Sequence, residues 1–100
     1  MPKLRLAPAA RDDVRDIRIY SKTIFGPTVA SAYISGLREA LAMLADLTSA
    51  GAAESDLGED IRGFAYRSHR IYYRPIDQGV LIIRILHHSR NAPRALGRNE

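Results

Sequence analysis

The sequence predicts an α+β domain in which two N-terminal helices cover one face of a small, mainly antiparallel sheet. Two observations lead to this class. Up to residue 48, apolar residues recur every three or four positions, which is the period of amphipathic helices. From Ile61 to His87, β-branched and aromatic residues gather in short runs, which is typical of strands. The predicted order is β-α-α-β-β-β, in a single domain spanning residues 1–100.

The first half of the chain contains one short strand and two helices. Residues 3–7 alternate around two leucines and predict the strand, after which Pro8 suits the first turn of a helix. That helix should end near Gly26-Pro27, and a second should begin at about Thr28, forming a helical hairpin. The expected apolar stripes are Ala10, Val14, Ile17 and Ile24 in the first helix, and Val29, Tyr33, Leu37, Leu41, Leu44 and Thr48 in the second.

The second half contains a loop, three strands and a tail. Residues 49–60 are small, acidic and glycine-containing, and predict a loop. Strands are expected over residues 61–67, 69–74 and 80–87, with a turn at 77–79 between the last two. The run at 80–87 is the most hydrophobic of the chain and suits a central strand. Residues 91–100 read as a polar tail.

Composition excludes several classes of protein. The chain has no cysteine, which rules out disulfides, thiolate catalysis and cysteine zinc sites. Apolar runs fall short of the roughly 20 residues that cross a bilayer, and the N-terminus lacks the apolar core of a signal peptide. We therefore expect a cytoplasmic protein without a metal or cofactor.

The positive charge is concentrated near the C-terminus. The net charge is +4, and residues 61–98 hold eight arginines against one acid, Asp77. Arginine suits bidentate contacts with carboxylate or phosphate, so this region indicates an acidic partner. A purely solubilising basic surface is the alternative. The arginines are Arg62, Arg67, Arg70, Arg74, Arg84, Arg90, Arg94 and Arg98.

Strand alternation divides this region into two faces. We predict that the helix-covered face carries Ile71, Tyr73, Leu81, Ile83 and Ile85. The open face would then carry Arg70, Tyr72, Arg74, Arg84 and His88. A register slip of one residue would invert the assignment. His87 and His88 should point to opposite faces, which argues against a shared metal ion.

An open face of this kind could bind phosphate and stack a base. It could also cleave RNA, with His88 as general acid or base and Arg70 or Arg84 stabilising the phosphorane. The alternative is structural: the arginines are solvated and Tyr72 merely covers the sheet.

Several sequence segments, in their order and spacing, resemble those of a known protein superfamily. They are Leu6 to Asp13, Ile61-Arg62-Gly63-Phe64, Tyr66, His69 to Arg74, Val80 to His87 and Ser89-Arg90-Asn91. Together they resemble the ParE/RelE superfamily of type II toxins, and more closely its ParE branch, over nearly the whole chain. One departure is Ala7, which stands where many relatives carry a Ser or Thr helix cap.

The resemblance implies one of two activities. RelE-like members are ribosome-dependent mRNA endonucleases, whereas ParE-like members generally lack the RNase residues and act on DNA gyrase. Arg70 falls where the endonucleases carry a catalytic arginine, and His88 lies near the position of a catalytic histidine. However, no tyrosine follows His88, and residues 49–60 lack the usual lysine or glutamate arrangement. We therefore expect gyrase inhibition without catalysis; mRNA cleavage by Arg70, Arg84 and His88 is the alternative.

The resemblance also implies a ParD-like antitoxin that wraps the toxin. We expect arginines of the C-terminal strands to meet antitoxin carboxylates, and the helical hairpin to supply apolar contacts. The residues expected to bind antitoxin or target are Arg62, Arg67, Arg70, Tyr72, Arg74, Arg84, His88 and Arg90.

Overall fold

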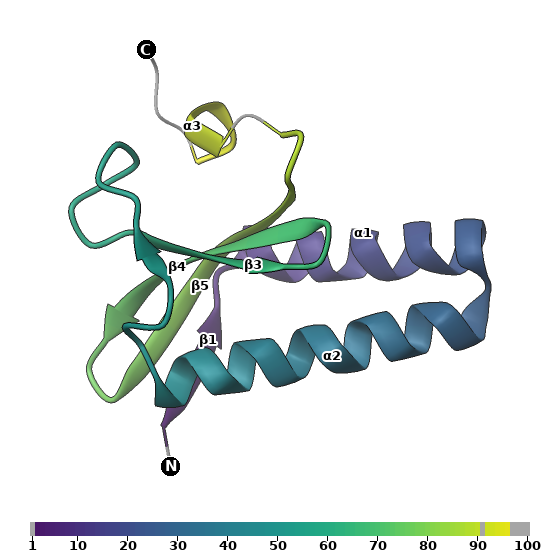
Figure 1. Ribbon diagram of the computed structural model, residues 1–100, viewed down its shortest axis with the longest axis horizontal. Coiled ribbons are helices and arrows are strands. Elements are labelled where there is room, and N and C mark those ends of the chain that lie inside the picture. Colours follow the sequence, from purple (N-terminus) through teal and green to yellow (C-terminus); the bar gives the residue numbers. More distant parts are fainter. Residues whose placement is uncertain (1, 91, 97–100) are drawn as a thin grey trace.

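The computed structural model describes residues 2–90 and 92–96 of the chain. A helical hairpin extends beyond one end of a twisted sheet (Figure 1). The elements in order are β1 (Lys3–Leu6), α1 (Pro8–Phe25), α2 (Pro27–Asp46), β2 (Ala52–Ala53), β3 (Arg62–Tyr66), β4 (His69–Ile76), β5 (Gly79–His87) and α3 (Ala92–Ala95).

The sheet confirms the predicted α+β class and adds one strand to it. Its five strands lie in the order β1-β5-β4-β3-β2. All neighbouring pairs are antiparallel except β1 and β5, which run parallel. Both long helices and the strands β2, β3 and β4 lie between β1 and β5 in the chain, so the connection is long enough for a parallel pair. The most hydrophobic strand, β5, lies between β1 and β4, as expected of a central strand. The extra strand is β2, inside the predicted loop.

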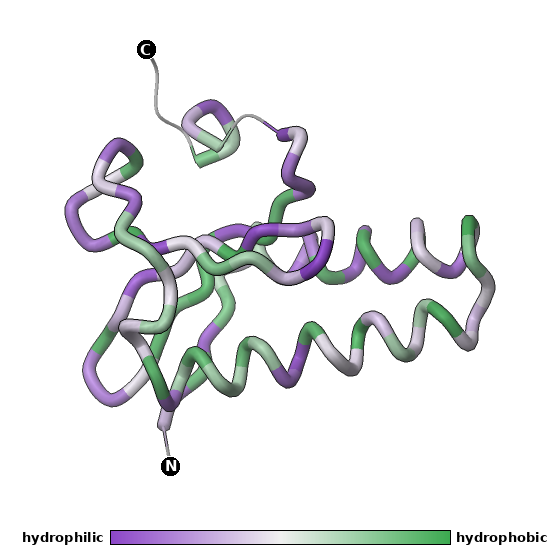
Figure 2. The backbone as a smooth tube through the Cα atoms, in the orientation of Figure 1, coloured by the Kyte–Doolittle hydropathy of each residue, from purple (hydrophilic) through white to green (hydrophobic). Residues whose placement is uncertain are grey.

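Proline and glycine set the bounds of the two long helices. Both begin with proline in their first turn, where its missing N–H is not needed. Ala7 provides no side-chain cap for α1. Gly26 joins the helices with φ of 88°, a backbone conformation that favours glycine. Hydrophilic and hydrophobic segments alternate along both helices, and the turn between β3 and β4 is hydrophilic (Figure 2).

The main core lies between the helices and one face of the sheet. Leu37 and Leu44 of α2 and Tyr73 of β4 are completely buried there. The Tyr73 hydroxyl donates to the Thr48 carbonyl oxygen at 2.7 Å and accepts from the Gly51 N–H at 2.8 Å, so the polar end of this core residue is satisfied. Not all of the predicted stripe is buried, because Ile24 and Val29 lie at the hairpin tip beyond the sheet, 54% and 51% exposed.

The predicted face assignment of β5 is wrong in its first half. A register irregularity opposite Tyr72 and Tyr73 leaves Ile83 as an extra residue, so Tyr72 pairs with Arg84 but Tyr73 pairs with Ile82. Val80 and Ile82 therefore enter the main core in place of Leu81 and Ile83. Beyond the bulge the predicted alternation holds. Ile71, Tyr73 and Ile85 are buried in the main core, as predicted.

The second face of the sheet is covered rather than open. Leu57, Tyr72 and Leu86 form a second small core there, and Ile61, Ala92, Ala95 and Leu96 pack against it. The predicted polar tail thus contains α3, which helps to cover the sheet; residues 91 and 97–100 of that tail lie outside the described part. Apolar side chains on both faces explain this second layer, because the continuous apolar run of β5 would otherwise expose Leu86.

Candidate functional site

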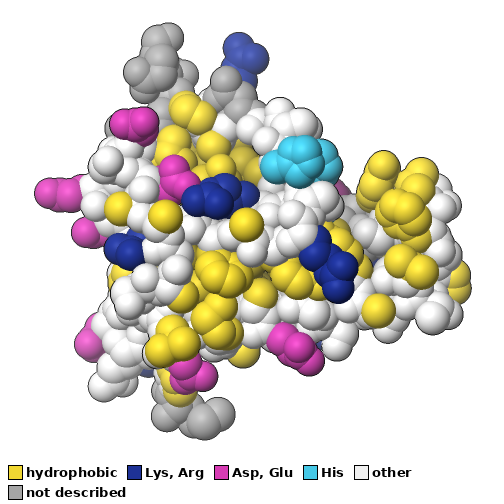
Figure 3. All heavy atoms as spheres, in the orientation of Figure 1, with side chains coloured by type: hydrophobic (Ala, Val, Ile, Leu, Met, Phe, Trp, Pro, Cys, Tyr) yellow, Lys and Arg dark blue, Asp and Glu magenta, His cyan; other side chains and the backbone are white. Residues whose placement is uncertain are grey.

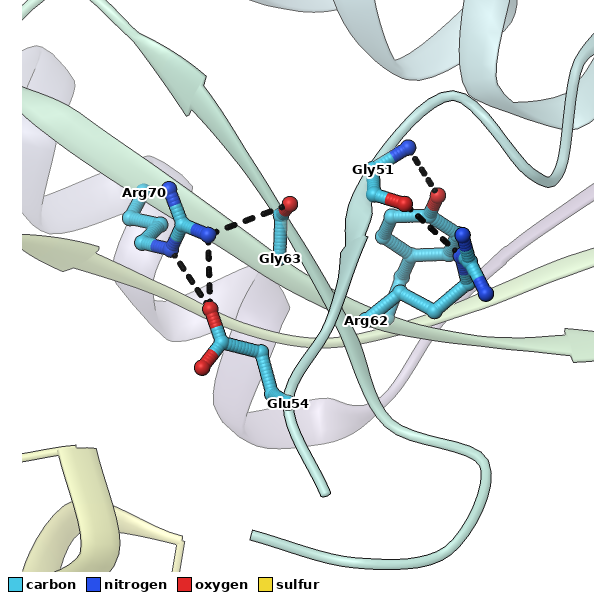
Figure 4. Close-up of polar contacts among 6 residues, drawn as sticks. Gly51, Glu54, Arg62, Gly63 and Arg70 are labelled. Carbon is cyan, nitrogen blue, oxygen red and sulfur yellow. Dashed lines mark hydrogen bonds and ion pairs between the residues drawn. The ribbon is translucent and has the colours of Figure 1, made fainter. Parts of the chain in front are cut away.

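Arg70 is held by a carboxylate of the chain itself. Its guanidinium donates to Oε2 of Glu54 at 2.6 Å and 3.0 Å, and to the Gly63 carbonyl oxygen at 3.3 Å (Figure 4). Gly63 permits this close approach, since a Cβ there would lie 2.6 Å from the Glu54 carboxylate and 2.7 Å from Arg70 Nε. A carboxylate of the acidic loop thus neutralises Arg70 directly.

Arg62 binds backbone groups in the first residues of the same loop. Its Nε donates to the Gly51 carbonyl oxygen at 2.8 Å, and its Nη2 donates to the Ser49 carbonyl oxygen at 3.2 Å (Figure 4). Arg62 and Arg70 together attach residues 49–54 to the edge of the sheet. Both arginines therefore hold a loop in place, and both guanidinium groups already have partners within the chain.

Arg84 pairs with Asp13 of α1. Two guanidinium nitrogens donate to the two carboxylate oxygens at 2.7 Å and 2.9 Å, and a third donates to the Ala95 carbonyl oxygen of α3 at 2.9 Å. The side chains are 18% and 11% exposed. The hydrogen bond that Arg84 donates to Asp13, partly opposed by burial, raises the pKa of Arg84 above its ordinary value. Asp13 also accepts the Ile85 N–H at 2.8 Å, where β5 extends past the end of β1.

The predicted catalytic set is therefore not assembled. Arg70 and Arg84 each bind an internal carboxylate, while the His88 ring lies 4.3 Å from that of His87. Among the described residues, no hydrogen bond, ion pair or ring contact joins any two of these three side chains. Tyr72 is only 9% exposed, so it covers the sheet and offers no stacking platform. Its burial, together with the Glu54 charge, raises the pKa of its hydroxyl.

A different surface is hollowed and accessible. A groove of about 820 Å³ separates the helical hairpin from the β3–β4 turn and the end of β5. Hydrophobic side chains gather at the projecting tip of the hairpin, across the hollow from cationic groups (Figure 3). The apolar wall includes Ile17, Tyr20, Phe25 and Val29, and the polar wall includes Arg67, Ser68, His69, His87 and Arg90. The acidic residues Asp13 and Asp16 of α1 also line the groove.

Two histidines, His69 and His87, belong to the polar wall, and the ring of His88 lies beside that of His87. The Tyr33 hydroxyl lies 2.6 Å from Nδ1 of His69, and the rings of His69 and His87 are 5.5 Å apart, edge to face. Burial lowers the pKa of His69, and the charges of His87 and His88 lower it further. His87 and His88 do not point to opposite sides as predicted, because β5 ends at His87 and the chain turns there. No three potential ligands within residues 2–90 and 92–96 are placed to hold a metal ion.

Arg67 and Arg90 differ from the arginines of the sheet. Both are exposed, and neither forms an ion pair with an acid in the part of the chain described. Arg67 stacks its guanidinium 5.8 Å from the centre of the Tyr66 ring. Its φ of 51° lies in the left-handed region, which is unfavourable for arginine and recurs at functional sites. Arg74 is also exposed and unpaired among these residues, but it lies away from the groove.

Only some of the residues in and around this groove had been predicted from the sequence. Arg67, His88 and Arg90 were among the predicted site residues, but Tyr33, His69 and His87 were missed as a cluster. Their meeting requires α2, β4 and β5 to come together, which local patterning does not encode. The exposed residues Ile24 and Val29 had been assigned to buried stripes. A detectable signal was the length of each helix, since a sheet of short strands cannot cover helices of 18 and 20 residues.

These features define a small basic α+β protein in which the sheet residues Arg62, Arg70 and Arg84 bind groups of the same chain, and in which a groove borders the exposed apolar tip of the hairpin. Residues 4–92 match the family described as the ParE toxin of the type II toxin–antitoxin system parDE. The chain therefore belongs to the ParE toxin family. None of the described helices carries an apolar stretch of membrane-spanning length.

A solved structure has the same fold. The chromosomal ParDE toxin–antitoxin system from P. aeruginosa contains a chain that superposes with a TM-score of 0.74 at 19% sequence identity. The match covers 87% of this protein and 96% of that chain. No curated protein sequence gives a significant match.

Proposed function

We propose that this ParE toxin inhibits DNA gyrase without catalysing a reaction, and that a ParD-like antitoxin neutralises it by direct binding. The observation that supports a non-catalytic role is the pairing of Arg70 with Glu54 and of Arg84 with Asp13. An arginine that stabilises a phosphorane must be free to meet the developing charge. Gyrase as the target follows from the ParE branch of the superfamily.

Expression of the chain without antitoxin tests the proposed target. We expect growth arrest, loss of supercoiling by purified gyrase, and accumulation of gyrase–DNA cleavage complexes. We expect no cleavage of ribosome-bound mRNA in a translating extract. Cleaved mRNA with unaffected gyrase would overturn the proposal, and Arg70→Ala would then be examined in the same extract.

The alternative, mRNA cleavage, has one observation in its favour. Imidazoles suited to proton transfer lie beside cationic groups at the groove wall, where His69 and His87 are close to Arg67. An endonuclease built on this chain would use these side chains rather than the paired Arg70 and Arg84. His87→Ala would abolish mRNA cleavage in that case, and it should leave gyrase inhibition intact under our proposal.

The groove is the proposed binding site of the antitoxin. Its apolar wall suits the hydrophobic face of a peptide segment, and Arg67 and Arg90 on the other wall are available for carboxylates. The partner segment should therefore be amphipathic and acidic. This assignment replaces Arg62, Arg70 and Arg84 as antitoxin contacts, because their guanidinium groups already have internal partners.

Calorimetric titration of the antitoxin into the toxin tests this binding site. Replacing Arg67 and Arg90 by alanine should weaken binding at least tenfold and reduce its dependence on salt, since both charges face the peptide. Changing Arg5 and Arg74 together to alanine removes two exposed arginines outside the groove and serves as the matched control. Equal losses in both variants would show that net charge alone governs affinity, and would refute the groove.

A further inference from the structure

The outer side of the helical hairpin carries a row of cations on α1. Arg11, Arg15, Arg18 and Lys22 are spaced by four, three and four residues. At about 3.6 residues per turn, these positions lie within roughly 60° of arc on one side of the helix. At about 1.5 Å per residue the row extends for roughly 16 Å. We call these four residues the cationic row. All of them are exposed.

Two shallow grooves flank the cationic row and contain no acidic residue in their linings. One, of about 480 Å³, is lined by Arg18, Lys22 and, across the seam in α2, Arg38, together with the hydroxyl-bearing Ser31 and Ser35. The other, of about 450 Å³, is lined by Arg11, Arg15, Arg18 and Arg38 above apolar residues. Arg38 thus adds a fifth cation that faces the row from the second helix.

Most of these charges have no ion-pair partner among the residues that the structure describes. Arg15 contacts Asp12 and Asp16 at 3.5 Å, in pairs that are more than 60% exposed. Arg11, Arg18, Lys22 and Arg38 form no ion pair within residues 2–90 and 92–96. Like charges four residues apart destabilise a helix slightly, as Arg11 with Arg15 and Arg18 with Lys22 do. Interhelical or intrahelical pairing therefore does not account for the row.

We propose that the cationic row and Arg38 bind the phosphate backbone of duplex nucleic acid. Duplex DNA carries about one negative charge per 1.7 Å of axis, so a row of this length faces a dense line of phosphates. The serine hydroxyls in the groove can also donate to phosphate oxygens. This surface is separate from the antitoxin groove, and the inference holds whether or not gyrase is the target.

The surrounding residues favour a duplex over other anions. The groove linings contain no aromatic side chain, and stacking platforms are needed to hold single-stranded bases. An acidic peptide would need exposed apolar anchors, and among the lining residues only Leu4 is a large exposed hydrophobic, at 39%. Backbone contacts of this kind carry no sequence information, so we expect binding without sequence preference.

Fluorescence anisotropy with the purified full chain and a labelled duplex of arbitrary sequence tests the proposal. Binding measured between about 50 and 200 mM salt should weaken steeply, with a log–log slope of about −4 to −5 for five phosphate contacts. Changing Arg18 and Lys22 together to alanine should reduce this slope by about two. Alanine is a strong helix former, so α1 should persist, and circular dichroism checks that it does.

The matched control changes Arg5 and Arg74, two exposed arginines outside both grooves, to alanine. This variant loses the same charge and should keep the slope of the unaltered protein. Equal slopes for the two double variants would overturn the assignment to the cationic row. The duplex assignment would be refuted by tighter binding to a single strand, or by equally effective competition from polyglutamate at the same charge concentration.

Discussion

Asp13 connects three parts of the molecule through one carboxylate. From α1 it accepts two hydrogen bonds from Arg84 of β5 and one from the Ile85 N–H. Arg84 in turn donates to the Ala95 carbonyl oxygen of α3. The backbone N–H at the end of β5 lacks a strand partner there, because β1 pairs only as far as Ile82. The Asp13 carboxylate thus accepts hydrogen bonds both from the unpaired end of β5 and from a largely buried cation.

Replacing Asp13 by alanine should lower the free energy of unfolding by about 2 kcal/mol or more, because a largely buried arginine and an N–H lose their acceptor. Urea unfolding measures this loss. Asp16→Ala is the control on the same helix; its carboxylate is 69% exposed, so the change should stay within about 0.5 kcal/mol. Similar effects of both substitutions would contradict the structural role of Asp13.

His69 makes stability depend on pH. Its folded pKa is lowered below its ordinary value of 6.5, mainly by burial. The unfolded chain therefore binds more protons as the pH falls through about 6.5, and stability falls with it until the folded pKa is passed. His69→Gln should flatten this decline between about pH 7.5 and pH 5. Urea midpoints across that range check the prediction, and an unchanged pH slope would contradict it.

At the scale of elements, the sheet is covered on both faces by different means. The long helices α1 and α2 bury one face in a core that includes completely buried residues of α2, β4 and β5. The other face carries only a small core under residues 54–61 and α3. The bulge at Ile83 changes which residues of β5 reach each face, so that both Ile82 and Ile85 face the helices.

Leu57 is the main contact of the acidic loop with the sheet, and it is 6% exposed. Leu57→Ala should cost about 2 kcal/mol, at the lower end for a buried leucine, because the loop can relax into the space. It should also increase protease cleavage within residues 54–61. Leu47→Ala, at a site 60% exposed, is the control. Unchanged stability and protection in Leu57→Ala would mean that the loop does not depend on this contact.

At the scale of the whole molecule, the hairpin extends beyond the sheet and leaves its tip uncovered (Figure 1). Tyr20, Ile24, Phe25 and Val29 are each more than half exposed there. An apolar cluster of this kind is typical of an interaction site rather than of a free monomer's surface. The two cationic regions lie on the outer seam of the hairpin and on the polar wall of the groove.

Phe25→Ser should make the free toxin more soluble while leaving its free energy of unfolding within about 0.5 kcal/mol, because Phe25 is 60% exposed. Light scattering of concentrated toxin without antitoxin measures association, and urea unfolding measures stability. The same variant should bind antitoxin less tightly if the tip supplies the apolar contacts. Unchanged self-association would show that the free toxin does not associate through the tip of the hairpin.

The sequence determined the order of the main elements, the helical hairpin and the central position of β5. These follow from periodicity, from Gly26 and Pro27, and from one dominant apolar run, all of which are local signals. The order and spacing of the segments around His69-Arg70-Ile71 also placed the chain in its family, which the match over residues 4–92 confirmed.

Tertiary structure decided which side chains are available to contact a partner. Because the run at 80–87 is apolar at most positions, it shows no alternation that could reveal the bulge at Ile83. The pairing of Arg84 with Asp13 joins residues 71 positions apart, and no local pattern specifies such a contact. Arginines that look equivalent in sequence thus become structural at 62, 70 and 84, and remain available at 67 and 90, because only folding brings carboxylates and carbonyl oxygens within their reach.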